Sequence, residues 1–337
     1  MADTKAEYYL IDVLKLFFSI CIVALHTNLF LREYPALYWY FSHVIWRIAV
    51  PFFFISSGYF FCQKVKASST PHRVLKNAVK RLLILFCFWL CITLPLEINT
   101  LMLKEYTIMQ MLTDLIKQAI LYPWGALWYL LALILAYLFI YPFIIKKSYK
   151  LPLCLGACLF SFALICNSYY FIIENTFVQG IADGYLELFI SARNGIFLGF
   201  FYVAIANYLT VKKPFSKKGN ILLLCIGLVS LFLEAAIIRG QNYKDDHSLF
   251  LSLPIVTLAL FELAKSYTLT RSGKQLRNLS IGIYVLHRPV LGYLDYFLHL
   301  SKRVGSITLF FIVLLLTAFL VYLLQRINHP FIKRIIT

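Results

Sequence analysis

The first apolar segment of the chain, YYLIDVLKLFFSICIVALHTNLF, contains three side chains suited to acid–base chemistry: Asp12, Lys15 and His26. Lys15 and His26 are eleven residues apart, which on an α-helix returns to nearly the same face, about 16 Å further along the axis. Histidine is the usual general base near neutral pH. We therefore expect His26 to accept a proton and Lys15 to place a cation further along the same face.

A structural interpretation of each of these residues stays open. Asp12 and Lys15 could form an interfacial pair that reaches the lipid headgroups. His26 could form a hydrogen bond that only holds two helices together.

Three further side chains are expected at the depth of His26. Arg47, Trp128 and Arg193 each lie near the outer end of an inward-running apolar segment. A buried arginine beside an imidazole can hold a developing oxyanion or the carboxylate of a ligand. The alternative is that both arginines extend to the outer headgroups.

A second histidine, His287, lies midway along the apolar segment that contains IGIYVLHRPV. Pro289 follows it and cannot donate a backbone hydrogen bond, so we expect a helix kink with His287 at its base. This kink could form the wall of a cavity, or His287 could be purely structural. Asp295, Glu234 and Glu97 are nearer predicted helix ends, where an interfacial role is expected.

The amino-acid composition indicates the environment in which these residues lie. Of the 337 residues, 61% are hydrophobic and only 14% are charged, whereas a soluble chain has about 25% charged residues. Apolar runs of about 20 residues recur, each long enough to cross a bilayer. The composition predicts an all-α, polytopic membrane protein and excludes soluble enzymes, nucleic-acid binders and secreted disulfide scaffolds.

Hydropathy predicts a bundle of about ten transmembrane helices in one integral membrane domain over 1–337. Most of the 32 Lys and Arg residues lie in every second connection, beginning with the N-terminal segment. This bias predicts that both termini are cytoplasmic and explains most of the net charge of +17 without a nucleic-acid partner. The N-terminus has no cleavage site of small residues, so the first span is expected to stay attached as an anchor. The predicted spans are 9–30, 43–62, 81–98, 122–145, 151–173, 188–209, 220–238, 248–266, 279–300 and 305–325.

The eight cysteines form no CxxC pair and have no histidine at metal-ligand spacing. We expect them to be small apolar packing residues, without a disulfide framework or a metal site.

Five sequence motifs together resemble the acyltransferase family three membrane proteins, which include O-acetyltransferases of bacterial polysaccharides and lipids. In chain order they are IDVLK…VALHT, WRIAVPFFFISSGYFF, ALWYLLAL, SARNGIFLGFFY and IGIYVLHRPV. The single-module arrangement is similar to the enterobacterial-common-antigen O-acetyltransferase type.

The resemblance implies roles for named residues. Family members carry an arginine, ten residues and then a histidine in the first helix; here His26 fits, but Lys15 replaces the arginine. Lysine keeps the charge and loses the planar fork that grips phosphate or carboxylate. The implied catalytic residues are His26, Lys15 and Asp12, and the implied substrate-binding residues are Arg47, Ser56, Trp128, Arg193, Tyr284 and His287.

The resemblance implies O-acyl transfer at the bacterial plasma membrane. The donor would be an acyl-CoA, most simply acetyl-CoA, entering from the cytoplasm near basic segments 64–81 and 265–277, with no permanently bound cofactor and no metal. His26 would take a proton from a hydroxyl of a surface polysaccharide or lipid-linked glycan, and Arg47 or Arg193 would steady the oxyanion. No Ser/His/Asp order is present, so direct transfer is expected.

A transporter is the alternative. The family type also forms the membrane half of vancomycin-resistance serine racemases, in which it is thought to move an amino acid. Arg47 and Arg193 would then bind a carboxylate, and His26 would act as a gate. No racemase domain is expected after residue 325, which favours the enzyme. A scaffolding subunit is the third and least favoured interpretation, because intramembrane charges are costly.

Overall fold

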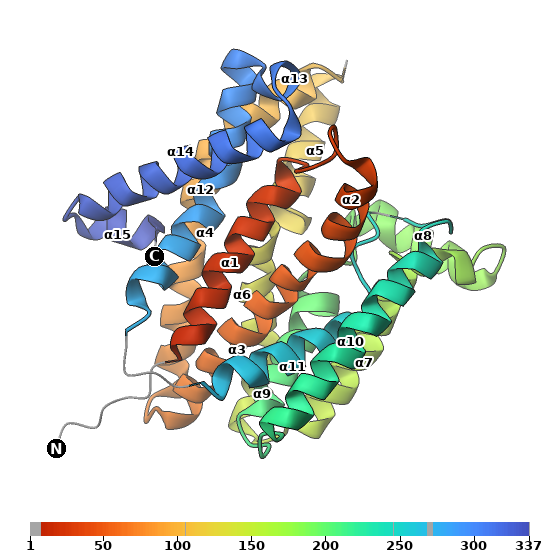
Figure 1. Ribbon diagram of the computed structural model, residues 1–337, viewed down its shortest axis with the longest axis vertical. Coiled ribbons are helices and arrows are strands. Elements are labelled where there is room, and N and C mark those ends of the chain that lie inside the picture. The colour runs from red at the N-terminus through yellow and green to blue at the C-terminus, as the bar shows by residue number, and fades with distance from the viewer. Residues whose placement is uncertain (1–7, 105, 245, 268–271, 337) are drawn as a thin grey trace.

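The computed structural model describes residues 8–104, 106–244, 246–267 and 272–336, and these are helical with connecting turns (Figure 1). The all-α prediction is confirmed for this part of the chain. The elements in order are α1 (Tyr9–His26), α2 (Pro35–Tyr40), η1 (Phe41–Ile45), η2 (Trp46–Ile48), α3 (Ala49–Ala67), α4 (Pro71–Met102), α5 (Ile108–Leu121), α6 (Trp128–Ile145), α7 (Lys150–Ile165), η3 (Tyr170–Ile172), α8 (Phe177–Phe189), η4 (Gly195–Gly199), α9 (Phe200–Leu209), α10 (Lys217–Ile238), α11 (Leu253–Lys265), α12 (Lys274–Leu298), α13 (Leu300–Arg303), α14 (Ser306–Arg326) and α15 (Pro330–Ile336).

Among the described residues, six helical stretches are long and apolar enough to cross a membrane. They are Tyr9–His26, Pro35–Ala67, Pro71–Met102, Trp128–Ile145, Lys217–Ile238 and Ser306–Arg326. The other four predicted spans also contain helices: α7, η4 with α9, and α11 are shorter, and α12 carries several polar and charged residues. The chain is a multi-pass membrane protein; the number ten and the sidedness of the termini stay predictions.

Helix α1 lies in the middle of the bundle, where it packs against α12, α3 and α11 (Figure 1). Helix α3 also contacts α9, α4 and α6. Helices α14 and α15 flank α12 on one side, and α7, α10 and α8 lie on the other. Side chains of α1, α3 and α12 therefore face one another at the centre of the molecule.

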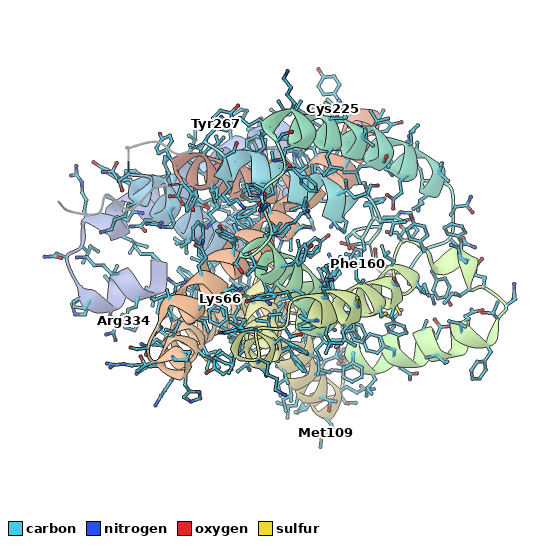
Figure 2. The ribbon with its side chains drawn as sticks, turned by 90° about the horizontal axis from the view of Figure 1, so that it is seen from below. Lys66, Met109, Phe160, Cys225, Tyr267 and Arg334 are labelled. Atoms are coloured by element: carbon cyan, nitrogen blue, oxygen red, sulfur yellow. The ribbon has the colours of Figure 1, made fainter. Side chains whose placement is uncertain are left out.

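The molecule is apolar on its periphery as well as in its core. Figure 2 shows Met109 of α5 and Cys225 of α10 at opposite outer edges, whereas Phe160 of α7 lies inside. Phe160 stacks on Phe201 of α9 with ring centroids 4.8 Å apart. An apolar outer surface of this kind is stable when lipid covers it.

Helices α5 and α8 have no counterpart among the predicted spans. Both are amphipathic and expose large apolar side chains, such as Ile108 and Phe177. The Lys117 ammonium of α5 donates a hydrogen bond to the backbone carbonyl of Glu187 in α8. Because each is shorter than a full membrane crossing, a search for apolar runs passes over them.

Two predicted spans are irregular where they carry their arginines. The prediction for 43–62 was one regular helix, but a π-turn over Phe41–Ile45 and a 3₁₀ turn over Trp46–Ile48 precede α3, and Arg47 lies in the latter. Residues 190–194 are not helical, and the Asn194 side chain accepts hydrogen bonds from the backbone N–H groups of Ile196 and Phe197. Such irregular turns are common at functional sites.

Helix α12 continues as one helix through Pro289. The kink expected at His287 stays a prediction.

Candidate active site: two cavities that share Tyr284

Two cavities lie in the middle of the bundle, one towards each end of α1. The first, here called the basic cavity, has a volume of about 680 Å³ and is lined by Lys15, Lys64, Arg81 and Arg277. The second, here called the histidine cavity, has a volume of about 390 Å³ and includes His26 in its lining. Tyr284 of α12 lines both.

The basic cavity is positively charged. Its four cations come from α1, α3, α4 and α12, and no Asp or Glu is among its lining residues in the described part of the chain. The Lys15 ammonium lies 5.2 Å from the centre of the Phe60 ring. Apolar and aromatic side chains form the rest of the wall. The cavity suits a ligand that combines phosphate groups with an apolar arm.

Asp12 lies beside this cavity rather than beside His26. It is buried, and its Oδ2 atom is 3.7 Å from Nη1 of Arg277. Because α1 is a continuous helix, Lys15 and Asp12 are more than two turns away from His26. The three residues predicted to be catalytic therefore serve two different cavities.

In the histidine cavity, the imidazole of His26 stacks against that of His287, with ring centroids 5.3 Å apart and 27° between the ring planes. His287 is fully buried, and its Nδ1 atom lies 3.1 Å from the carbonyl oxygen of Ile283. A carbonyl only accepts hydrogen bonds, so Nδ1 of His287 carries the proton. His26 thus faces the cavity with His287 behind it.

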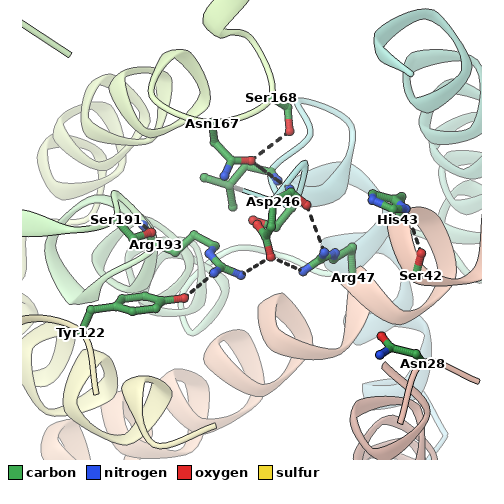
Figure 3. Close-up of polar contacts among 12 residues, drawn as sticks. Asn28, Ser42, His43, Arg47, Tyr122, Asn167, Ser168, Ser191, Arg193 and Asp246 are labelled. Atoms are coloured by element: carbon green, nitrogen blue, oxygen red, sulfur yellow. Dashed lines mark hydrogen bonds and ion pairs between the residues drawn. The ribbon is translucent and has the colours of Figure 1, made fainter. Parts of the chain in front are cut away.

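A three-residue ion cluster forms another wall of the histidine cavity (Figure 3). Oδ2 of Asp246 lies 3.1 Å from Nη1 of Arg47 and 2.8 Å from Nη1 of Arg193. Arg47 also donates to the backbone carbonyl of Asp246 at 3.1 Å. Burial alone would raise the pKa of the Asp246 carboxyl, but the two guanidinium groups outweigh it and hold that pKa below its usual range. Asp246 is therefore a carboxylate at neutral pH.

The loop that carries Asp246 is fixed by side chains from other elements. Oδ1 of Asn167 accepts hydrogen bonds from the backbone N–H groups of Ser248 and Leu249, at 2.9 and 3.0 Å. The Glu234 carboxylate accepts a hydrogen bond from the backbone N–H of Ser252, at 2.9 Å, where α11 begins. Glu234, predicted to be interfacial, thus anchors the end of this loop.

Two aromatic rings lie beside the guanidinium of Arg193. The rings of Tyr122 and Trp128 each have their centre 5.5 Å from Cζ of Arg193, and the Tyr122 hydroxyl accepts a hydrogen bond from Arg193. Cation–π contacts of this type hold an arginine in a defined place. The cavity brings together His26, Arg47, Trp128 and Arg193, the residues expected at one depth.

The ring of Tyr284 stands between the cavities. Its hydroxyl donates a hydrogen bond to the Ala126 carbonyl, and its ring lies edge-on to those of Tyr129 and Phe53, with centroids 5.5 and 5.9 Å away. Tyr129 and Phe53 line the basic cavity. These aromatic rings form the partition between the two spaces.

Ser56 is placed differently from the other predicted site residues. It is fully buried, its hydroxyl donates to the Phe53 carbonyl at 3.2 Å, and it is absent from the described lining of both cavities. The adjacent Ser57 lines the basic cavity instead. Adjacent residues of a helix point about 100° apart, so only one of the two serines faces the cavity. The motif contains both and does not show which one it is.

Two charged lining residues of the histidine cavity, Asp246 and Arg288, are not among the predicted site residues. Asp246 lies in the connection between the predicted spans 220–238 and 248–266, and hydropathy gives no signal that this loop folds back into the bundle. Arg288 lies inside the predicted span 279–300, where a charged side chain is costly, and this cost is the signal that the sequence offers.

Within the described ranges, no three His, Cys, Asp or Glu side chains are grouped closely enough to hold a metal ion. The eight cysteines are free thiols, and five of them are exposed on the outside of the bundle.

Comparison with known proteins identifies relatives by sequence. No solved structure matches this chain. The chain is 27% identical over 333 residues to a serine/alanine racemase of Enterococcus gallinarum, covering 96% of this chain and 47% of that protein. It is 25% identical over 300 residues to an amino-acid racemase of Enterococcus faecalis, covering 83% and 40%. The chain thus spans less than half the length of these relatives. Residues 8–326 match the acyltransferase domain of acyltransferase family three, and the chain therefore belongs to that family.

Proposed function

We propose that the protein is a membrane O-acyltransferase that moves an acyl group, most simply acetyl, from acyl-CoA to a hydroxyl group. The observation that carries this proposal is the pair of cavities, one lined by four cations and the other by an imidazole, which share the ring of Tyr284. The acceptor is a cell-envelope glycan or a lipid-linked sugar.

The donor binds in the basic cavity. Lys15, Arg81 and Arg277 face the phosphates of acyl-CoA, and charge-assisted hydrogen bonds of this type are stronger than neutral ones. The apolar wall formed by Phe53, Leu130 and their neighbours accommodates the arm that carries the thioester. With the predicted sidedness, in which both termini are cytoplasmic, this cavity faces the cytoplasm, where acyl-CoA is found.

The transfer takes place beside His26. The imidazole accepts the proton of the acceptor hydroxyl while that oxygen attacks the thioester carbon. The resulting oxyanion is stabilised by the positive field of Arg47 and Arg193, whose combined charge exceeds that of Asp246. Collapse of this intermediate breaks the carbon–sulfur bond, and the CoA thiolate takes the proton back from His26. The ring of Tyr284 must move for the thioester to reach His26.

The test is acetyl transfer by the purified protein in lipid nanodiscs, with radiolabelled acetyl-CoA and an envelope glycan extract. His26→Ala is expected to lower transfer by about 100-fold or more, the usual contribution of a general base. His72→Ala, on the exposed surface of α4, is the matched control and should retain the parental rate. Undiminished transfer by a correctly inserted His26→Ala protein would falsify the proposal.

The donor site has its own test. Arg81→Gln should raise the KM for acetyl-CoA by roughly 10-fold or more and leave kcat nearly unchanged, because it removes binding to phosphates far from the reacting atoms. Lys15→Arg should retain or improve binding, since arginine adds a bidentate fork. A KM unaffected by Arg81→Gln would place the donor elsewhere.

Transport of a small carboxylate or an amino acid such as serine is the second candidate. Two observations favour it: relatives that match most of this chain are named serine/alanine and amino-acid racemases, and the arginine pair already holds a carboxylate, that of Asp246. Uptake of labelled serine into proteoliposomes without acyl-CoA would support transport. Its absence, together with acetyl transfer, would support the enzyme.

A further inference from the structure

The histidine cavity is lined by a third arginine, Arg288, which the mechanism above does not use. Arg288 directly follows His287 on α12 and lines the same cavity as His26. It is only partly buried, unlike its neighbours on α12, and its exposed part faces the cavity. No other residue in the described part of the chain forms a hydrogen bond or an ion pair with its guanidinium.

The other two arginines of this cavity, Arg47 and Arg193, are ion-paired. Arg47 and Arg193 share the carboxylate of Asp246, which partly neutralises them. Glu97 of α4 lies within electrostatic range of Arg288 but forms no ion pair with it. The described lining therefore carries three guanidinium groups against a single carboxylate.

A guanidinium that forms no ion pair is costly inside a membrane protein, and such groups mark ligand sites. A neutral acceptor that fills the cavity would displace water and leave the charge of Arg288 without a counter-charge. An anionic group placed against Arg288 would supply that counter-charge.

The loop before α6 leaves room for this side chain. Gly125 has a φ of +65°, and a Cβ atom built there would lie 3.0 Å from Nε of Arg288. A side chain at position 125 would therefore crowd the guanidinium and adopt a strained backbone conformation. The glycine allows the loop to pass close to Arg288 without displacing it.

We propose that Arg288 binds an oxyanion, a carboxylate or a phosphate, carried by the acceptor, so that the substrate is an anionic hydroxyl compound. The proposal rests on the acyl-transfer function given above and specifies its acceptor. The hydroxyl lies at His26 and the anion at Arg288, and these two points of attachment orient the nucleophilic oxygen towards the donor cavity.

The experiment uses four probes in two matched pairs: glucuronate with its neutral methyl ester, and glucose 6-phosphate with glucose. Binding is measured as protection of the full chain in nanodiscs against thermal unfolding, without acyl-CoA. Transfer is measured separately with radiolabelled acetyl-CoA. The two members of a pair have the same hydroxyls at the shared ring positions, so a difference in their binding measures the contribution of the anionic group. The pair with the larger difference shows whether the site prefers a carboxylate or a phosphate.

For the parental protein we expect at least one anion to bind more tightly than its neutral partner, by roughly 10- to 100-fold, as for hydrogen bonds to a charged group. Arg288→Gln should abolish that preference, and Arg288→Lys should restore part of it. Arg239→Gln is the matched control, because Arg239 is exposed and stacks on Trp39 outside both cavities. It should retain the preference.

The outcomes separate this proposal from the proposed function. A preference that depends on Arg288, without acetyl transfer to any probe, supports the anion site and counts against the acyltransferase. Transfer at equal rates to the charged and neutral members of both pairs supports the acyltransferase and overturns the anion site. Protection by neither anion, or a preference that survives Arg288→Gln in a folded protein, also overturns it.

Discussion

His26 and His287 stack their imidazole rings at a centroid distance of 5.3 Å, bringing α1 and α12 together at the wall of the histidine cavity. Of the two, His26 alone lines that cavity. The Nδ1–H of His287 donates to the carbonyl of Ile283, and its Nε2 atom is buried without a hydrogen-bond partner among the described residues. His287 therefore contacts His26 through the face of its ring and does not line the cavity in which a ligand would bind. This makes it a positioning residue.

This division of roles predicts different results for two substitutions of His287. His287→Phe keeps a planar ring behind His26 and should retain transfer within a few-fold of the parental rate. His287→Ala leaves a cavity, lets His26 move, and should reduce kcat by roughly 10- to 100-fold. The measurement is kcat and KM for acetyl transfer, with insertion checked by size-exclusion chromatography. Equal loss of kcat in both variants would instead give His287 a chemical role.

The Asp246 cluster predicts a loss of stability when its single carboxylate is removed. Asp246→Asn leaves Arg47 and Arg193 next to each other without their shared anion. Because the Asp246 side chain is 35% exposed, we expect a cost of about 1–3 kcal/mol, less than for a fully buried pair. The measurement is the thermal unfolding midpoint in nanodiscs.

Asp183→Asn provides a matched control for this prediction. Asp183 pairs with Lys244 at 3.3 Å, but both side chains are more than 40% exposed. Exposed pairs contribute about 0–1 kcal/mol, so this variant should unfold near the parental midpoint. If the two variants had equal effects, the Asp246 cluster would be only a surface ion pair.

His247, next to Asp246, predicts how the loop responds to acid. Burial, with a smaller contribution from His43, lowers its pKa to about 4, below the ordinary value of about 6.5. The unfolded chain therefore takes up this proton first as the pH falls from about 6.5 to 4, and the folded state loses stability over that window. Above about pH 6.5 both states are neutral at this position and no effect remains.

The measurement is the unfolding midpoint of the parental protein and of His247→Phe between pH 8 and 4. The difference between them should be constant above about pH 6.5 and should shift in favour of the variant below it. Asp246 does not interfere in this window, because its depressed pKa keeps it ionised until lower pH. A difference that stays constant down to pH 4 would contradict the assignment.

The parts of the site that could be predicted from sequence are those fixed by helix periodicity and depth. Lys15 and His26 are eleven positions apart on one helix, so their common face and separation follow from helix geometry. The structure places them at two different cavities along α1. Arg47, Trp128 and Arg193 are at similar depths because each follows the start of an apolar run. They line one cavity with His26.

The remaining parts depend on contacts that periodicity does not encode. Asp246 reaches the two arginines because Asn167, in a different connection, holds the backbone of its loop. The π and 3₁₀ turns around Arg47 depend on tertiary packing rather than on local propensity. Hydropathy also misses α5 and α8, since a helix with only one apolar face lacks the continuous apolar run of a membrane span.

The partition formed by Tyr284 gives the last prediction. In the parental protein this ring is held by its hydrogen bond to the Ala126 carbonyl and lines both cavities. If the donor binds in the basic cavity as proposed, the ring separates its thioester from the histidine cavity. Tyr284→Ala removes the ring and joins the two spaces, so water should reach the thioester when no acceptor is bound. We expect acetyl-CoA hydrolysis to rise several-fold while transfer to the acceptor falls. Release of free CoA thiol without acceptor, followed with a thiol-reactive dye, measures this leak.

Tyr284→Phe separates the ring from its hydroxyl. It keeps the partition and loses one hydrogen bond, with a cost of about 1 kcal/mol, so hydrolysis should stay near the parental level. The same hydrolysis rate in Tyr284→Ala and the parental protein would mean that another group separates the cavities. A rise of equal size in both variants would assign the barrier to the hydroxyl and its anchor on Ala126. Only a leak confined to Tyr284→Ala supports the ring as the barrier, because only that variant lacks it.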